Sequence, residues 1–291
     1  MHIAIALVVL AVGSVIFHFL SPWWWTPIAS NWGFIDTTIL ITFWVTGIAF
    51  VAVLVFLAYC TYRYRGREGN KAEYKPEDKK LEWWLTIVTS IGVAIMLAPG
   101  LVAWNEFVTV PEGADEIEIV GKQWSWGYRF PGKDGMLGTT HIKFINDDNP
   151  FGLDPKDPNG QDDVLIDDNE LHLPLDRPVK ALLRSIDVLH DFYVPQFRAK
   201  MDMVPGMVTY FWLTPIRTGS FDVLCAELCG TGHYAMRGTV VVQEEAAFKA
   251  WLGEQPTFVQ SMAKAGKDAK ETKNAVLSEA EKDPAEKGLT Q

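Results

Sequence analysis

Three long stretches of this chain contain no charged side chain, and they constrain its fold more than any other feature. Residues 2–35, 37–60 and 83–105 hold no Lys, Arg, Asp or Glu. Each stretch approaches or exceeds the roughly 18–20 apolar residues that span a lipid bilayer as a helix. The pattern therefore excludes a soluble cytoplasmic protein.

The charged residues are concentrated in one other segment. Residues 106–254 carry 13 basic and 24 acidic side chains, and this segment explains the formal net charge of −10. A nucleic-acid-binding protein would need a basic excess, so that class is excluded. Three cysteines in 291 residues are also too few for a disulfide scaffold. The balance indicates a membrane anchor joined to an acidic domain in water.

The loop between the second and third stretches indicates the orientation in the membrane. Residues 61–82 contain the basic side chains Arg63, Arg65, Arg67, Lys71, Lys75, Lys79 and Lys80. The positive-inside rule places this loop in the cytoplasm. We therefore predict a transmembrane helical hairpin over residues 36–105, with residues from 106 onward on the outer side. Three tryptophans, residues 23–25, are expected at the outer interface.

The N-terminal apolar segment, residues 1–35, has two alternative fates. Only His2 precedes the apolar run, and no A-x-A motif follows it, so a secretory signal would lack both its basic start and its cleavage site. The segment is nevertheless apolar enough to be a signal-like segment or an extra span. Both alternatives stay open.

Residues 106–254 are predicted to form a β domain. Short β-prone runs alternate with turns that contain Gly or Pro, which is typical of an all-β sandwich or barrel. The predicted strands cover residues 116–120, 124–130, 141–145, 179–185, 208–213, 221–224 and 238–242. A short helix over 244–252 would close the domain. The polar tail, 255–291, is expected to be a solvated helix or disordered, without chemistry of its own.

One short segment of this domain carries metal-binding chemistry. Residues 225–236 read Cys-Ala-Glu-Leu-Cys-Gly-Thr-Gly-His-Tyr-Ala-Met, so two thiols, an imidazole and a thioether lie within twelve residues. Thiolate and thioether are soft ligands and imidazole is borderline, a set that favours copper. Gly230 and Gly232 would let the chain turn tightly enough to aim the ligands inward.

Three other interpretations of this segment stay open on the residues alone. Cys225 and Cys229 could form a disulfide, which is common outside the cytoplasm but would leave His233 and Met236 unexplained. A zinc site seldom includes methionine. A blue-copper centre needs one cysteine and two histidines, so one thiol would be spare.

With these residues in view, the chain closely resembles subunit II of the bacterial aa3-type cytochrome c oxidases over residues 30–254. That family joins a membrane hairpin to an outer cupredoxin-like Greek-key β-sandwich with the pattern C-x-E-x-C-x3-H-x2-M. The resemblance implies a dinuclear copper A centre, in which two thiolates bridge two coppers and each copper takes one imidazole nitrogen. The implied ligands are the side chains of Cys225, Cys229, His190 and His233, the weakly bound Met236 and the backbone carbonyl of Glu227.

The resemblance also implies roles other than copper binding. Trp124, in the run Gln-Trp-Ser-Trp-Gly-Tyr, would receive the electron from cytochrome c, whereas Trp126 and Tyr128 are expected in the core. The carboxylate of Glu227 would bind a Mg2+ ion shared with subunit I. Glu82 resembles the glutamate at the mouth of the K proton pathway; a plain interfacial charge that ends a span is the alternative.

Two acidic features are candidates for partner docking. Asp187 matches an acidic docking position of the family. The stretch 147–168 contains eight aspartates and only one basic residue, Lys156. An acidic surface would steer a basic cytochrome c by long-range electrostatics. A solvated insertion is the alternative for this stretch.

The function implied by the resemblance is electron entry into an oxidase of the bacterial inner membrane. Electrons from reduced cytochrome c would reach heme a of subunit I, where O2 is reduced to water with proton translocation. The implied partners are cytochrome c, subunit I, further oxidase subunits and the bilayer, and the chain alone would have no oxidase activity. The alternative is a membrane-anchored copper-delivery or thiol-redox protein that uses Cys225 and Cys229.

Overall fold

The computed structural model describes residues 1–21, 26–69, 71, 73–267 and 270, and the chain forms two compact units. The first unit comprises Met1–Ile28 and Trp32–Thr109, and the second comprises Ala29–Asn31 and Val110–Gln291. Tryptophans 23–25, predicted at a membrane interface, lie outside the described residues.

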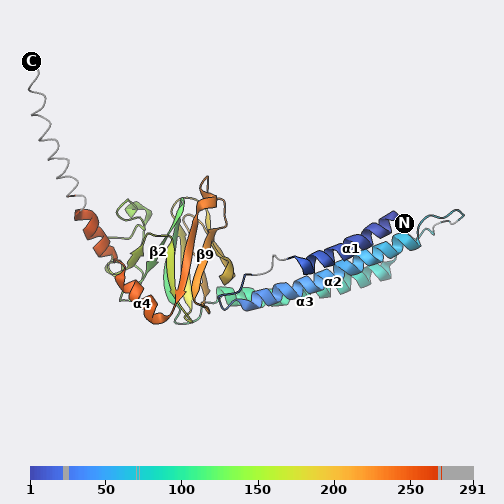
Figure 1. Ribbon diagram of the computed structural model, residues 1–291, viewed down its shortest axis with the longest axis horizontal. Coiled ribbons are helices and arrows are strands. Elements are labelled where there is room, and N and C mark those ends of the chain that lie inside the picture. Colours follow the sequence, from blue (N-terminus) through green and yellow to red (C-terminus); the bar gives the residue numbers. More distant parts are fainter. Residues whose placement is uncertain (22–25, 70, 72, 268–269, 271–291) are drawn as a thin grey trace, which may run out of the picture. The chain divides into compact units, whose positions relative to one another are not determined.

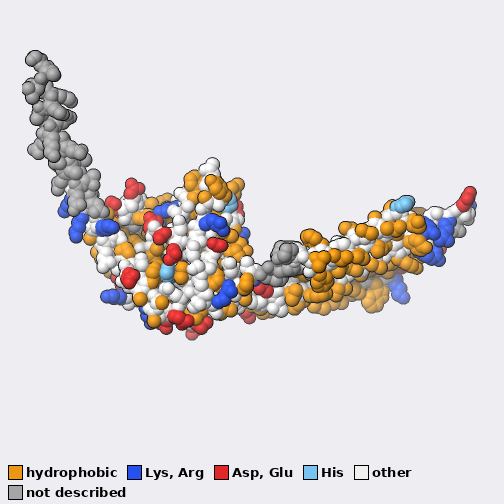
Figure 2. All heavy atoms as spheres, in the orientation of Figure 1, with side chains coloured by type: hydrophobic (Ala, Val, Ile, Leu, Met, Phe, Trp, Pro, Cys, Tyr) orange, Lys and Arg blue, Asp and Glu red, His pale blue; other side chains and the backbone are white. Residues whose placement is uncertain are grey.

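The first unit is helical (Figure 1). Its helices are α1 (His2–Leu20), α2 (Gly33–Arg63) and α3 (Lys79–Val108). Each is long and apolar enough to cross a membrane. Their apolar side chains are mostly exposed along their length, as Figure 2 shows, and this is the surface that a lipid bilayer would cover. The predicted N-terminal apolar helices are confirmed, and the first uncharged stretch also forms a helix of spanning length.

The second unit is a β-sandwich of two five-stranded sheets, ordered β3-β2-β1-β5-β8 and β4-β10-β9-β6-β7. The pairs β1 with β5 and β4 with β10 are parallel, and the other pairs are antiparallel. The predicted β-sandwich is therefore confirmed. The strands are β1 (Asp115–Lys122), β2 (Ser125–Phe130), β3 (Val164–Ile166), β4 (Glu170–Pro174), β5 (Val179–Ser185), β6 (His190–Val194), β7 (Ala199–Met203), β8 (Thr209–Leu213), β9 (Gly219–Cys225) and β10 (Arg237–Gln243).

Alternation along the strands explains the core of this unit. In β5, buried and half-exposed residues alternate from Val179 to Ser185, as expected for a strand with one face toward the other sheet. The large side chains that the two sheets bury between them include Ile119, Leu171, Leu183, Phe192 and Phe211, each no more than 2% exposed. This packing gives the strand ends a rigid base.

The strand prediction over residues 141–145 is wrong. Ile142–Phe144 form a 3-10 turn, because Nδ1 of His141 accepts a hydrogen bond from Lys143 N and the His141 carbonyl accepts one from Phe144 N. Such local bonds compete with strand pairing even where the side chains favour a strand. Strands β3, β4, β6 and β7 were not predicted, since their sequences are short or interrupted by acidic and basic residues.

The domain extends past the closing helix. Helix α4 (Glu245–Glu254) confirms the short helix predicted over 244–252. Beyond it, Leu165 N donates to the Pro256 carbonyl and Phe258 N to the Asp163 carbonyl. Phe258 is 1% exposed and packs in an apolar cluster under the loop between β2 and β3. The expectation of a solvated tail from 255 is therefore wrong for Phe258, whereas residues 259–267 continue as a largely exposed helix, one of the two alternatives expected.

A short segment between α1 and α2 also belongs to the β unit. Ala29 N donates to the Gln196 carbonyl at 2.8 Å, and Ile216 N donates to the Ala29 carbonyl at 2.9 Å. Ala29 and Ser30 are 0% and 1% exposed. A fragment that begins after α3 would lack this buried piece, so experiments on the β unit call for the full chain.

Candidate metal centre

The predicted metal ligands come together where strands of one sheet end. His190 begins β6 and Cys225 ends β9, and these strands pair antiparallel with Phe192 opposite Cys225. The loop after Cys225 returns to β10, whose first residue pairs with Leu224 of β9. Residues 225 to 236 are therefore folded back above the start of β6.

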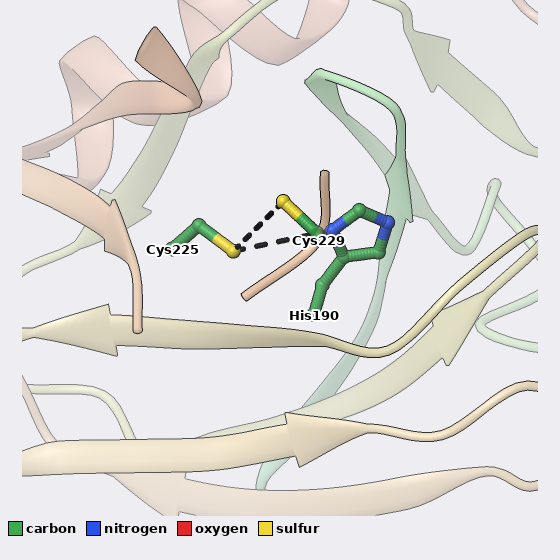
Figure 3. A group of neighbouring side chains, drawn as sticks. All are labelled: His190, Cys225 and Cys229. Carbon is green, nitrogen blue, oxygen red and sulfur yellow. Dashed lines mark hydrogen bonds between the residues drawn. The ribbon is translucent and has the colours of Figure 1, made fainter. Parts of the chain in front are cut away.

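The side chains of His190, Cys225 and Cys229 point toward one another (Figure 3). The Sγ atoms of Cys225 and Cys229 lie 3.7 Å apart, and Cys225 Sγ lies 3.9 Å from Nδ1 of His190. On the other thiol, Cys229 Sγ lies 3.6 Å from Nδ1 of His233 and 3.8 Å from Sδ of Met236. Each thiol thus has an imidazole of its own.

These distances fit a metal centre and not a disulfide. A disulfide needs an S–S distance of about 2.05 Å, and both cysteines are free thiols here. Donors that share a tetrahedral metal at bond lengths of about 2.0–2.3 Å lie about 3.3–3.8 Å apart. The donor set is soft sulfur with imidazole, and Met236 at 1% exposure belongs to it, so copper fits better than zinc.

The environment of Cys229 keeps its thiol protonated until a metal binds. The residue is 2% exposed. Burial, together with the neighbouring Cys225 thiol, raises the pKa of Cys229 to about 11. Because metals bind the thiolate, binding here must displace protons.

Asp187 holds the imidazole of His190. Its Oδ1 lies 2.8 Å from Nε2 of His190, which leaves Nδ1 facing Cys225. Its carboxylate also accepts hydrogen bonds from Gln123 N and Val188 N, both at 2.6 Å. Partial burial raises the pKa of Asp187, but these hydrogen bonds outweigh it and the net pKa is lowered. Such a partner orients a metal-binding histidine; a docking role for Asp187 stays a prediction.

Trp124 lies against residues 225–236, which we call the copper loop. Its indole Nε1 donates to the Cys229 carbonyl at 3.2 Å, and its side chain is 41% exposed. A Cβ on Gly232 would lie 2.3 Å from Trp124 Cδ2, so only glycine permits this contact. Trp126 and Tyr128 are fully buried, as predicted.

Gln123 is a contributor that the sequence did not reveal. Its Nε2 donates to the Cys229 carbonyl at 2.8 Å, so this carbonyl accepts hydrogen bonds from two successive residues. The bond joins positions 106 residues apart. No local pattern signals a contact over that separation.

The remaining predicted site residues lie apart from this cluster or at its edge. The Glu227 carbonyl oxygen lies 3.2 Å from Cys225 Sγ, in keeping with a weak ligand. Within the described residues, His190, Cys225 and Cys229 form the one group of three or more His, Cys and acidic side chains close enough to hold a metal, and Glu227 does not belong to it. Glu82 lies in the first turn of α3, in the other unit.

The acidic stretch 147–168 is largely used to build its own loop. Asp157 accepts hydrogen bonds from the backbone and side chain of Thr139, and Asp162 accepts one from Lys133 N. Asp163 is buried against Arg129. These hydrogen bonds stabilise turns within the stretch. A role of the stretch in attracting a basic partner stays a prediction.

The fold and the ligand set define a membrane-anchored cupredoxin-type protein with a copper-binding loop. Residues 116–244 match the family described as cytochrome c oxidase subunit II, periplasmic domain. The "Alternative cytochrome c oxidase subunit 2" of Bradyrhizobium diazoefficiens is 63% identical over 258 residues, which cover 89% of this chain and 93% of that protein. The chain therefore belongs to the cytochrome c oxidase subunit 2 family.

More distant relatives were also found. The "Cytochrome c oxidase subunit 2" of Cereibacter sphaeroides is 28% identical over 235 residues, 78% of this chain and 77% of that protein. A crystal structure of the periplasmic domain of subunit II of cytochrome oxidase from Bradyrhizobium japonicum is 28% identical, with a TM-score of 0.37, and covers 50% of this chain and 95% of its own. As a family member, the chain is a subunit of a cytochrome c oxidase, a membrane protein with a periplasmic domain.

Proposed function

We propose that this chain is the subunit through which electrons enter its oxidase. It accepts an electron from reduced cytochrome c at a dinuclear copper A centre and passes it to heme a of subunit I, where O2 is reduced to water with proton translocation. The proposal depends above all on the two thiols 3.7 Å apart, each beside its own imidazole. When bound, the copper pair supplies a one-electron carrier whose charge is shared across bridging thiolates.

The ligand residues keep the centre's geometry fixed while an electron is gained or lost. His190 and Cys225 lie on paired strands, and Asp187 fixes the orientation of the His190 ring. A site on rigid strands changes its bond lengths little on reduction. Little rearrangement means a low barrier to electron transfer.

We propose that the surface that binds the electron donor, cytochrome c, centres on Trp124. This ring is partly exposed and is hydrogen-bonded to the Cys229 carbonyl, which gives the electron a short route to a thiolate. Asp167 pairs with Lys122 at 2.9 Å, and Asn169 accepts a hydrogen bond from Trp126 N, so segment 167–169 lies beside the turn that carries Trp124. The exposed carboxylate of Asp168, which accepts a hydrogen bond from Asn169 N, would attract a basic cytochrome. We further propose that the Glu227 carboxylate binds Mg2+ together with subunit I.

The test is electron paramagnetic resonance, with metal analysis, on the full chain in detergent after copper loading. A seven-line hyperfine pattern with two coppers per chain would support the centre, since one electron shared by two equivalent copper nuclei gives that pattern. A four-line pattern, bound zinc or a Cys225–Cys229 disulfide would contradict it. The copper-delivery or thiol-redox alternative would then be favoured.

We expect Trp124→Ala to slow electron transfer from cytochrome c by roughly a hundredfold, the scale on which lost positioning acts. Trp124→Phe, which keeps a ring but loses the bond to the Cys229 carbonyl, should be intermediate. Stopped-flow reduction by cytochrome c in the assembled enzyme measures both. The resonance spectrum of the copper centre should not change, and wild-type transfer rates in Trp124→Ala would remove the proposed route.

We expect Glu82→Ala to slow turnover of the assembled enzyme several-fold while reduction of the copper centre stays intact, because proton supply and electron entry are separate steps. Steady-state oxygen consumption and stopped-flow copper reduction distinguish them. Glu77→Ala, in the exposed segment just before α3, is the matched control. Unchanged turnover in Glu82→Ala would leave Glu82 as a charge in the first turn of α3.

A further inference from the structure

Gly121 is an unexpected residue at its position near the end of β1. It is buried and pairs with Trp126 of β2 and Ser185 of β5. Its φ is not among the positive values found in the chain, so its backbone does not need glycine. Glycine inside a strand is unfavourable by roughly 0.5–1 kcal/mol relative to alanine. A close approach by another group is one reason for a glycine at such a position.

The approaching group is the imidazole of His190. A Cβ on Gly121 would lie 3.2 Å from Cδ2 and 3.4 Å from Cγ of that ring, and 3.3 Å from Sδ of Met203. Favourable carbon contacts begin at about 3.5 Å. His190 and Met203 are opposite each other on β6 and β7, in the sheet that faces β1. The ring therefore occupies the space that a side chain at 121 would fill.

The other surroundings leave this ring no easy way to move. His190 is fully buried, and its Nε2 is bound to Asp187 at 2.8 Å. The Trp126 ring stands edge-on to it, with centroids 6.4 Å apart at 63°. A side chain at position 121 would contact the ring and would therefore shift Nδ1 relative to Cys225.

We propose that Gly121 is a positioning residue for the copper centre. Because it has no side chain, the His190 imidazole can lie where it does, and this position sets the ligand geometry at one of the two metal positions. This inference rests on the proposed function. His233 contacts the other thiol, Cys229, and the three atoms nearest to a Cβ at position 121 belong to His190 and Met203. A methyl group at 121 thus acts on one copper position and not on the other.

The consequence is a loss of equivalence between the two coppers. In Gly121→Ala the ring must give way by a few tenths of an ångström, which weakens one copper–nitrogen bond. The unpaired electron then concentrates on one metal, so the seven-line pattern changes toward four lines. The reduction potential should rise, because a weaker imidazole donor stabilises the oxidised copper less. Copper affinity should fall roughly tenfold, as expected when the support of a metal-binding histidine is disturbed.

The experiment compares four full-length chains in detergent by resonance spectroscopy, redox titration and copper stoichiometry. They are wild type, Gly121→Ala, Gly253→Ala and the double variant Gly121→Ala with Met203→Val. Gly253 lies in α4 with open space around its Cα and is the matched control. The double variant relieves the contact with Met203 Sδ but leaves the new methyl group about 3.2 Å from the His190 ring, so it should fold more readily and keep most of the change in the spectrum. Near-ultraviolet circular dichroism of the metal-free chains checks that each is folded.

Each outcome separates the two proposals. A wild-type chain without a seven-line pattern contradicts the proposed function. If wild type has that pattern and Gly121→Ala keeps it, with unchanged potential and affinity, the positioning role is wrong while the function stands. If Gly121→Ala does not fold, the double variant decides: a shift from wild type in its spectrum supports the role, and an unaltered spectrum and potential overturn it.

Discussion

Cys229→Ser should eliminate the dinuclear centre and reduce cytochrome c oxidation by the assembled enzyme to background. The Sγ atom of Cys229 lies within 3.8 Å of three other donor atoms, those of Cys225, His233 and Met236. A serine hydroxyl is a hard donor that suits copper poorly, and a single thiolate cannot complete the bridge. We expect at most one copper per chain and a four-line resonance pattern.

The matched control for this prediction is Cys60→Ser. Cys60 is also a free thiol but lies in α2, in the helical unit. Copper stoichiometry, the resonance spectrum and oxygen consumption should all match wild type. Retention of two coppers and a seven-line pattern in Cys229→Ser would contradict the assigned bridge.

Arg129→Met should destabilise the β unit by about 3–5 kcal/mol, the cost of leaving the buried Asp163 without its charged partner, whereas Glu118 keeps its ion pair with Arg184. Nε of Arg129 lies 2.8 Å from Glu118, and its Nη1 binds both Asp163 and the Gly138 carbonyl. All three charged side chains are no more than 4% exposed. Burial raises the pKa of Glu118, but Arg129 and Arg184 outweigh it and lower the net pKa.

Pulse proteolysis of the full-length chain in detergent measures this loss. The matched control is Lys249→Met, which breaks an exposed pair with Glu245 at 2.6 Å and should cost only about 0.3–0.5 kcal/mol. The loop between β2 and β3 should become the first protease-sensitive segment, because Asp163 and Gly138 tie it to β2 through Arg129. A loss no larger than that of the control would mean that this buried network contributes little to stability.

The copper loop was predictable because its ligands are close in sequence. Cys225, Cys229, His233 and Met236 fall within twelve residues, and their chemistry alone favours a soft metal. His190 is 35 residues from Cys225, and its assignment required the family resemblance. Antiparallel pairing of β6 with β9 removes that separation in space.

The elements that were missed share a physical cause. The turn at 142–144 forms because a histidine side chain and its carbonyl satisfy nearby N–H groups, which β propensity does not describe. Phe258 belongs to the segment predicted to be a polar tail, yet it is buried in an apolar cluster with Val120, Phe151, Leu153 and Leu165. Both outcomes depend on specific contacts in the folded chain that strand and tail propensities do not describe.

From the sequence alone, three features determined a membrane-anchored chain with a soft-metal site: the hydrophobic runs, the basic loop and the spacing of the thiols. Each of these features acts over a short stretch of chain. Tertiary structure alone decided how that site is held. Asp187 is turned toward His190, Gln123 reaches a carbonyl 106 residues away, and Gly121 makes room for a ring from the opposite sheet. The contacts of Gln123 and Gly121 arise only when the two sheets pack face to face, since packing brings together residues that are far apart in the sequence. The contact of Asp187 with His190 spans three residues and depends on how the chain turns between β5 and β6.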